Sequence, residues 1–218
     1  MNRFVIILLF ISSAVIIAQE NKFGTYYNQR KTLFESLPDD KNEIIFLGNS
    51  ITDGCNWSEL FPDKKIRNRG ISGDVTEGIL FRLNEITASK PDKIFLMIGV
   101  NDLAIGLTPD SLLINYRKIL QTVKRETPKT KLFVQSVLPV NEGFGKFANH
   151  VTKSNSVLIV NEGLQKLAHE MNYSYLDLYS SFADENGVLK PEFTNDGLHL
   201  TGAGYMLWKS LIEKYVYD

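Results

Sequence analysis

The chain has 218 residues, 44% of them hydrophobic and 22% charged, which is the composition of an ordinary globular protein of one domain. The formal net charge is −1 and there is no basic block, which excludes the electrostatic signature of a protein that binds nucleic acid or an anionic membrane surface. A single cysteine, Cys55, excludes an intramolecular disulfide, so the core must hold the fold without covalent cross-links.

The first eighteen residues have the pattern of an export leader. Arg3 precedes an apolar run over residues 4–18 that ends in a small residue, as in a signal peptide. The run is short for a membrane span of roughly 20 residues. A buried helix or an uncleaved anchor is the alternative. We expect a signal peptide over 1–18 and a single domain over 19–218, exported to the periplasm or secreted, without stable membrane insertion after cleavage.

Five short segments predict β-strands, of which the one over 65–69 is weak and the other four are mainly apolar. The strands are expected over residues 43–47, 65–69, 94–98, 132–137 and 173–178. The first and third are continuous apolar runs, which is typical of strands buried on both faces of a sheet.

Helical spacing of apolar residues lies before, between and after these strands. Helices are expected within 20–40, where the helix would pack outside the sheet, briefly within 54–61, and then from 75, from 108, over 157–171 and over 205–215. Asp74 is expected to cap the helix that starts at Val75, with Glu77 completing a capping box. Gly73 would then lie just before a helix N-terminus, where free backbone N–H groups favour negative charge.

Alternation of strands and helices requires right-handed crossovers and a parallel sheet covered on both faces. The predicted fold is therefore α/β, a three-layer, doubly wound parallel sheet of about five strands. Ser50, Gly73 and Asn101 each follow one of the first three strands. Because the carboxyl ends of parallel strands share one edge, and open sheets bind ligands there, these residues should lie close together.

A serine hydroxyl needs a base to become a nucleophile, and histidine is the usual base. The segment Asp196-Gly197-Leu198-His199, in a turn before the last helix, supplies an imidazole and a carboxylate that could orient it. The backbone N–H groups of Ser50 and Gly73 and the side-chain amide of Asn101 form a plausible oxyanion hole. Each residue also has a structural explanation, in a turn or a cap, but four such coincidences at the right strand ends are improbable.

Other reactive side chains have less support. Cys55 is expected to be a small buried hydrophobic residue rather than a nucleophile. His169 lies in a helical pattern and is expected to face solvent. His150 lies in the long connection over 140–153, which has the length of functional loops, and could contact a substrate. There is no Gly-x-Ser-x-Gly elbow, glycine-rich phosphate loop or metal-ligand cluster.

Four blocks of the sequence resemble those of the SGNH (GDSL-type) hydrolases, over about residues 43–215. The blocks are Gly48-Asn49-Ser50-Ile51, Ile71-Ser72-Gly73-Asp74, Gly99-Val100-Asn101-Asp102 and Asp196-Gly197-Leu198-His199. The residues that flank these blocks are most similar to those of platelet-activating-factor acetylhydrolase-like enzymes and of sialate O-acetylesterase-like bacterial proteins. Asn49 departs from the aspartate usual before the serine. The resemblance implies a flavodoxin-like sheet, no metal or other cofactor, and a triad of Ser50, His199 and Asp196. It also implies that Gly73 and Asn101 are oxyanion donors.

The leading hypothesis is an exported serine esterase that removes a short acyl group, acetyl above all, from a carbohydrate or other small-molecule ester. One alternative is a lysophospholipase or short-chain lipid esterase, in which Phe144 and Phe147 would hold the acyl chain. Another is a carbohydrate-binding protein that keeps the fold without catalysis. These hypotheses differ in preferred acyl length and in whether serine-directed reagents label Ser50.

Overall fold

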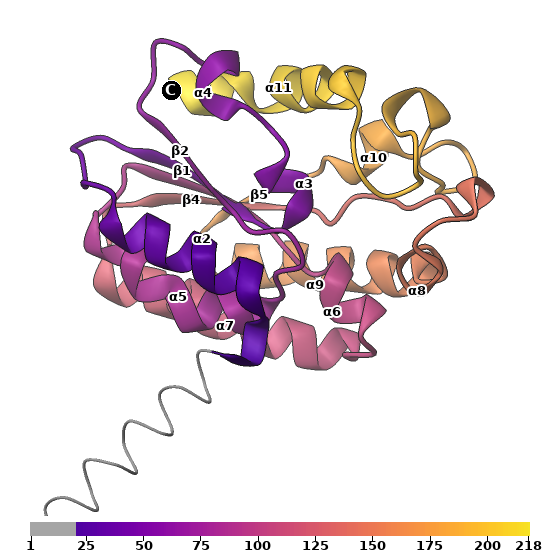
Figure 1. Ribbon diagram of the computed structural model, residues 1–218, viewed down its shortest axis with the longest axis horizontal. Coiled ribbons are helices and arrows are strands. Elements are labelled where there is room, and N and C mark those ends of the chain that lie inside the picture. Colours follow the sequence, from indigo (N-terminus) through magenta and orange to yellow (C-terminus); the bar gives the residue numbers. More distant parts are fainter. Residues whose placement is uncertain (1–20) are drawn as a thin grey trace, which may run out of the picture. The chain divides into compact units, whose positions relative to one another are not determined.

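The computed structural model describes residues 21–218 (Figure 1), so the predicted signal peptide over 1–18 lies outside the described residues. The chain divides into two compact units, one ending at Leu37 and one over Pro38–Asp218. The described part of the first unit holds a 3₁₀ turn η1 (Asn21–Phe23) and helix α2 (Thr25–Ser36). The predicted leading helix is therefore present, and its packing outside the sheet stays a prediction.

The second unit is built on a five-stranded sheet in which all neighbouring strands are parallel. The strands are β1 (Ile44–Gly48), β2 (Ile66–Gly70), β3 (Lys93–Met97), β4 (Lys131–Gln135) and β5 (Ser174–Leu176), in the order β2-β1-β3-β4-β5. This confirms the predicted doubly wound sheet, with its strand order reversing beside β1. The last two strands are shorter than predicted and end before residues 136 and 177.

Helices cover both faces of this sheet. They are α3 (Ser50–Asp53), α4 (Trp57–Leu60), α5 (Thr76–Ala88), α6 (Val100–Ala104), α7 (Pro109–Glu126), α8 (Ala148–Val151), α9 (Ser154–Met171), α10 (Tyr179–Phe182) and α11 (Gly202–Tyr217). Two 3₁₀ turns, η2 (Glu142–Phe144) and η3 (Pro191–Phe193), lie between them. Figure 1 shows α5, α7 and α9 side by side on one face, and α4 and α11 on the other.

A row of aromatic rings joins the sheet to α4 and α11. Phe46, Phe95 and Phe133 occupy matching positions on β1, β3 and β4, and their rings stack with centroids 5.0 and 4.6 Å apart. Trp57 stacks on Phe46 at 4.0 Å, and Trp208 meets Trp57 edge-on at 4.8 Å. The contact geometry is favourable for aromatic pairs, so this row fixes α11 against the sheet.

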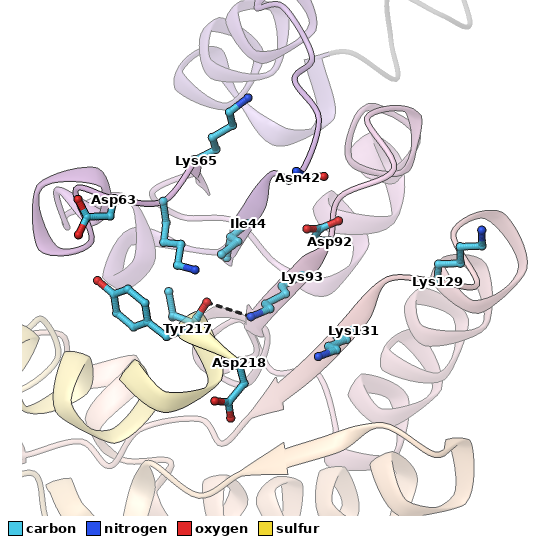
Figure 2. A pocket seen from close by; sticks show the side chains of 12 residues that line it. Asn42, Ile44, Asp63, Lys65, Asp92, Lys93, Lys129, Lys131, Tyr217 and Asp218 are labelled. Atoms are coloured by element: carbon cyan, nitrogen blue, oxygen red, sulfur yellow. Dashed lines mark hydrogen bonds between the residues drawn. The ribbon is translucent and has the colours of Figure 1, made fainter.

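Polar contacts anchor α11 at several points. The indole N–H of Trp208 donates to Gln135 Oε1 at 2.8 Å, and both side chains are buried. Lys93, at the start of β3, donates to the carbonyls of Tyr215 and Val216, both at 2.9 Å. Figure 2 shows Lys93 in a hollow at the amino-terminal edge of the sheet, which is lined by five lysines and three aspartates. The helix that follows the predicted Asp196–His199 turn is thus held along its length.

The predicted capping box before α5 is wrong. The cap residue is Val75, whose side chain makes no capping hydrogen bond. The Asp74 carboxylate instead accepts from the buried Arg82 guanidinium at 2.9 Å. The first N–H of the helix, on Thr76, donates to the Asp102 carboxylate at 2.9 and 3.1 Å. A side chain from helix α6 therefore replaces the local cap that the sequence suggested.

The short helices at strand ends were also not predicted from the sequence pattern. α3 begins at Ser50 directly after β1, and α6 begins at Val100 after β3. The connection over 140–153, where no regular element was predicted, contains η2 and α8. Among the described residues, no helix combines the length and the hydropathy needed to cross a membrane.

Candidate active site

Ser50 opens α3 at the carboxyl end of β1. Asn49 is the cap of this helix, and its Oδ1 accepts from the N–H of Ile51 at 3.1 Å. The Asn49 side chain is buried, so it orients the start of the helix rather than contacting solvent. The amide oxygen accepts this hydrogen bond as a carboxylate would, so asparagine can serve at a position where the resemblance to SGNH hydrolases implies aspartate.

His199 lies between Ser50 and Asp196. Its Nε2 is 3.0 Å from Ser50 Oγ, and its Nδ1 is 2.8 Å from Asp196 Oδ2. An ionised carboxylate only accepts hydrogen bonds, so Nδ1 carries the proton and the bare Nε2 of the neutral ring can accept from the serine hydroxyl. The three side chains that were predicted to converge therefore form one hydrogen-bonded series, in which Ser50 and His199 are 149 positions apart in the sequence.

The two oxygens of Asp196 have separate partners. Oδ1 accepts from the backbone N–H groups of Leu198 and His199, at 2.9 and 2.8 Å, while Oδ2 holds the His199 ring. The proposed turn role and the proposed catalytic role of Asp196 are therefore compatible in one side chain. Burial raises the pKa of this carboxyl, but the hydrogen bonds from His199 and Leu198 outweigh burial and hold its pKa below the ordinary value. The aspartate stays ionised beside the imidazole.

Gly73 lies in the loop after β2, and this loop is bound to α3. Asp53 Oδ2 accepts from the N–H of Ser72 at 3.2 Å and from its hydroxyl at 2.8 Å. Gly73 has a φ of +82°, which favours glycine even though a Cβ there would meet no atom within 4 Å. Neither the Gly73 nor the Ser50 N–H donates a hydrogen bond within residues 21–218. Both donors are available to a ligand.

Asn101 is the second residue of α6 and is 8% exposed. Its Nδ2 donates to the carbonyl of Asp74 at 2.9 Å, one residue beyond Gly73. Its Oδ1 lies 3.0 Å from His150 Nε2. An amide nitrogen has two hydrogens, and within the described chain the second one is not donated to any group. One N–H of Asn101 is therefore left over beside the Gly73 loop.

Two residues of the connection over 140–153, which the sequence suggested only as contacts for a substrate, also lie near this site. Phe147, in a left-handed conformation with φ +52°, lies edge-on to both His150 and His199, with ring centroids 5.8 and 5.1 Å away. His150 itself contacts Asn101. The sequence suggested that His150 lay in a functional loop and could contact a substrate. Its contact with Asn101 was not predicted, because no local pattern connects the two residues. Cys55 is buried as predicted, and burial raises the pKa of its thiol to about 12.

The site has no obvious metal ligands. Within residues 21–218, no three His, Cys, Asp or Glu side chains are grouped as they would be to hold a metal ion. His169 is exposed on α9, as predicted. What the arrangement offers is a hydroxyl next to a neutral imidazole, an ionised carboxylate behind the imidazole, and several unused N–H donors at one edge of a parallel sheet.

A five-stranded parallel sheet with helices on both faces and this constellation at its carboxyl edge defines the class of SGNH-type α/β hydrolases. The sequence profile of the GDSL-like lipase/acylhydrolase family matches residues 46–207, which is more than half of the chain. The chain belongs to this family.

Individual relatives agree with the assignment. The human platelet-activating factor acetylhydrolase IB subunit alpha2 is 31% identical over 186 residues, which cover 83% of this chain and 78% of that subunit. A solved structure from Streptococcus pneumonia, described as a platelet activating factor, is 31% identical, has a TM-score of 0.78 and covers all of both chains. A GDSL-like lipase from Bacteroides thetaiotaomicron is 25% identical, with a TM-score of 0.76 over 88% of this chain and 97% of that one.

Proposed function

We propose that this chain is a serine esterase that hydrolyses short-chain carboxylic esters, with acetyl as the acyl group and a carbohydrate as the alcohol. The observation that carries the proposal is the series from Ser50 Oγ through the His199 ring to Asp196, at 3.0 and 2.8 Å. In this geometry the hydroxyl proton has an acceptor within hydrogen-bond reach, and the imidazolium that forms has an ionised partner.

The chemistry proceeds in two halves. Ser50 Oγ attacks the ester carbonyl while His199 Nε2 takes the hydroxyl proton, and the negative charge moves to the carbonyl oxygen. His199 then returns the proton to the leaving alcohol, and an acyl group remains on Ser50. A water molecule repeats the sequence with the same base, releasing the acid and restoring the hydroxyl. Asp196 keeps the ring in the Nδ1–H tautomer throughout.

The negative oxygen of each tetrahedral intermediate needs donors that are already in place. The Ser50 and Gly73 N–H groups and the second N–H of Asn101 are the candidates, because each is unused within residues 21–218. Asp53 and Asp74 tie the Gly73 loop to α3 and to Asn101, so the three donors belong to one hydrogen-bonded assembly. Such preorganisation lowers the barrier without a reorganisation cost during the reaction.

Two features support a short acyl group. The curated relatives are named acetylhydrolases, and the nearby connection over 140–153 contributes little apolar surface. Phe147 is the one exposed large hydrophobic side chain of this connection, with 41% of its surface accessible. A single ring can cover an acetyl group or one face of a sugar, but it does not make a wall for a long acyl chain. With the expected leader, the substrate would be met in the periplasm or outside the cell.

A lipid ester is the second candidate, because the same relatives are named for platelet-activating factor. The two candidates are separated by hydrolysis of p-nitrophenyl esters of increasing acyl length and by acetate release from acetylated sugars and polysaccharides. We expect the highest kcat/KM for the acetyl ester and release of acetate from sugars. A preference for long acyl chains would contradict the carbohydrate assignment.

The nucleophile is tested with Ser50→Ala and His199→Ala, each of which should lower kcat by at least about 10⁴. A serine-directed phosphonate should label the wild type and fail to label Ser50→Ala. The matched control is Ser210→Ala, which removes an exposed hydroxyl on α11 that donates to the carbonyl of Leu207 and takes no part in the candidate site. A wild-type protein that resists the phosphonate and hydrolyses no ester would instead be a binding protein with this fold.

A further inference from the structure

His150 is the one histidine besides His199 that touches the assembly of donors, and neither the sequence blocks nor the family match gives it a role. It lies on α8, in the connection over 140–153, while Asn101 lies on α6. These two short helices contact each other, and α6 also contacts α9. The pairing of His150 with Asn101 bridges 49 residues of chain, so it is set by the tertiary fold.

The direction of this hydrogen bond follows from the chemistry of the amide. Asn101 Nδ2 donates to the Asp74 carbonyl at 2.9 Å, which identifies the other amide atom as the oxygen. That oxygen can only accept, so His150 Nε2, at 3.0 Å, must carry a proton and donate it. The bond persists whether His150 is neutral or protonated. Burial, with a smaller contribution from the charge of His199, lowers the pKa of His150 and favours the neutral ring.

Two hydrogen bonds on opposite ends fix the plane of the Asn101 amide. With Oδ1 held by His150 and one hydrogen of Nδ2 held by Asp74, the direction of the second hydrogen is determined. A hydrogen bond to the oxygen also polarises the amide and strengthens its N–H groups as donors. Both effects act on the second N–H of Asn101, which is the proposed side-chain donor to the oxyanion.

The position of His150 is itself constrained. Val151, the next residue, is buried, and Phe147, one helical turn earlier, contacts the His150 and His199 rings by their edges. Phe147 holds a φ of +52°, a conformation that is costly for a residue with a large side chain. The backbone is therefore strained at Phe147, the residue whose ring contacts both imidazoles.

We propose that His150 is a positioning residue, which acts through Asn101 by orienting and polarising the side-chain donor of the oxyanion hole. The inference rests on the proposed esterase function and assigns no proton transfer to His150. It implies that the connection over 140–153 belongs to the catalytic assembly as well as to the rim of the site.

The test uses a matched pair of variants. Glutamine can present an N–H near the position of His150 Nε2, whereas methionine has a similar length and volume without a donor. His150→Met should lower kcat for p-nitrophenyl acetate about 10-fold, the effect of one lost hydrogen bond, with KM nearly unchanged. His150→Gln should stay within about threefold of the wild type.

A double-mutant cycle shows whether His150 acts through Asn101. Asn101→Ala should lower kcat by roughly 10²–10³. In that background His150→Met should cost less than about twofold, because the group that it positions is gone. Equal losses for methionine and glutamine, or a full additional loss in the Asn101→Ala background, would overturn the inference while leaving the esterase function intact. An inactive wild type would overturn both.

Discussion

Asp102 is a buried carboxylate that links two of the helices next to the candidate site. It is 1% exposed, and it accepts from the N–H of Thr76 at 2.9 Å and from the Thr76 hydroxyl. Through these bonds one carboxylate joins α6, which carries Asn101, to the first turn of α5, which follows the Gly73 loop. Burial raises the pKa of Asp102 to about 6, although the hydrogen bonds from Thr76 oppose that rise.

This shift predicts a pH dependence of stability. The folded protein binds a proton at Asp102 more tightly than the unfolded chain, whose pKa has the ordinary value of 3.8. The contribution of Asp102 to the free energy of unfolding is therefore greatest below pH 3.8 and decreases as pH rises towards 6. Asp102→Asn has no such titration. Its free energy of unfolding relative to the wild type should increase by about 2–3 kcal/mol between pH 4 and 7.

Urea unfolding of both proteins at several pH values measures this difference. Asp110→Asn, at an exposed position on α7, is the control for the change in charge. It should show much less than the change of about 2–3 kcal/mol that is expected for Asp102→Asn. If the Asp102→Asn profile were parallel to that of the wild type, the carboxylate would be ionised without penalty in the fold and its raised pKa would be wrong.

At the scale of elements, the turn over 194–199 and the connection over 140–153 are clamped together. The N–H of Asn141 donates to the carbonyl of Gly197 at 2.8 Å. Gly197 has a φ of +85°, and a Cβ on it would lie 2.1 Å from the carbonyl oxygen of Asn141. Glycine is therefore required by both conformation and space, and the clamp acts on the turn two residues before His199.

Gly197→Ala should force these two segments apart. We expect a loss of about 2 kcal/mol or more in the free energy of unfolding, from strain and from the clash. We also expect a fall in kcat of at least about 10-fold, because small displacements of a base are costly. Gly106→Ala is the control, since Gly106 has a φ of +92° but open space around it. It should lose only about 1 kcal/mol and keep kcat. Equal effects of the two substitutions would show that the contact between Gly197 and Asn141 is not the cause of the losses in stability and kcat.

The elements show which parts of the molecule the sequence could predict. Buried apolar runs such as Ile44–Leu47 predict strands, and parallel topology then brings Ser50, Gly73 and Asn101 to one edge. Asp196 and His199 are three residues apart, so their contact is almost local. The cap that Asp102 gives to Thr76 and the contact of His150 with Asn101 join segments 26 and 49 residues apart. No local pattern encodes such contacts, and the wrong assignment of Asp74 as a cap follows from that.

In the Pro38–Asp218 unit as a whole, one edge of the sheet carries the candidate site and the other edge contributes to stability. The carboxyl edge carries the candidate site, where a hydroxyl, an imidazole and an amide meet. The amino edge contains a charged hollow, in which Lys93 is 8% exposed and binds the last carbonyls of α11 (Figure 2). These carbonyls have no partner within the helix, and a cation there also offsets the negative end of the helix dipole.

Because the hollow and the candidate site lie at opposite edges of the sheet, we expect a change at the amino edge to alter stability without altering catalysis. Lys93→Met keeps the apolar stem of the side chain but removes two hydrogen bonds, so the free energy of unfolding should fall by about 1.5–3 kcal/mol. Lys131→Met removes an exposed lysine from the same hollow and should change stability by less than about 0.5 kcal/mol. Both variants should keep the wild-type kcat at 25 °C, because Trp208 and Gln135 still hold α11 to β4 near the site. Denaturant unfolding combined with p-nitrophenyl acetate kinetics measures both quantities. A fall in kcat for Lys93→Met, at a temperature where the variant is fully folded, would show that the end of α11 is coupled to His199.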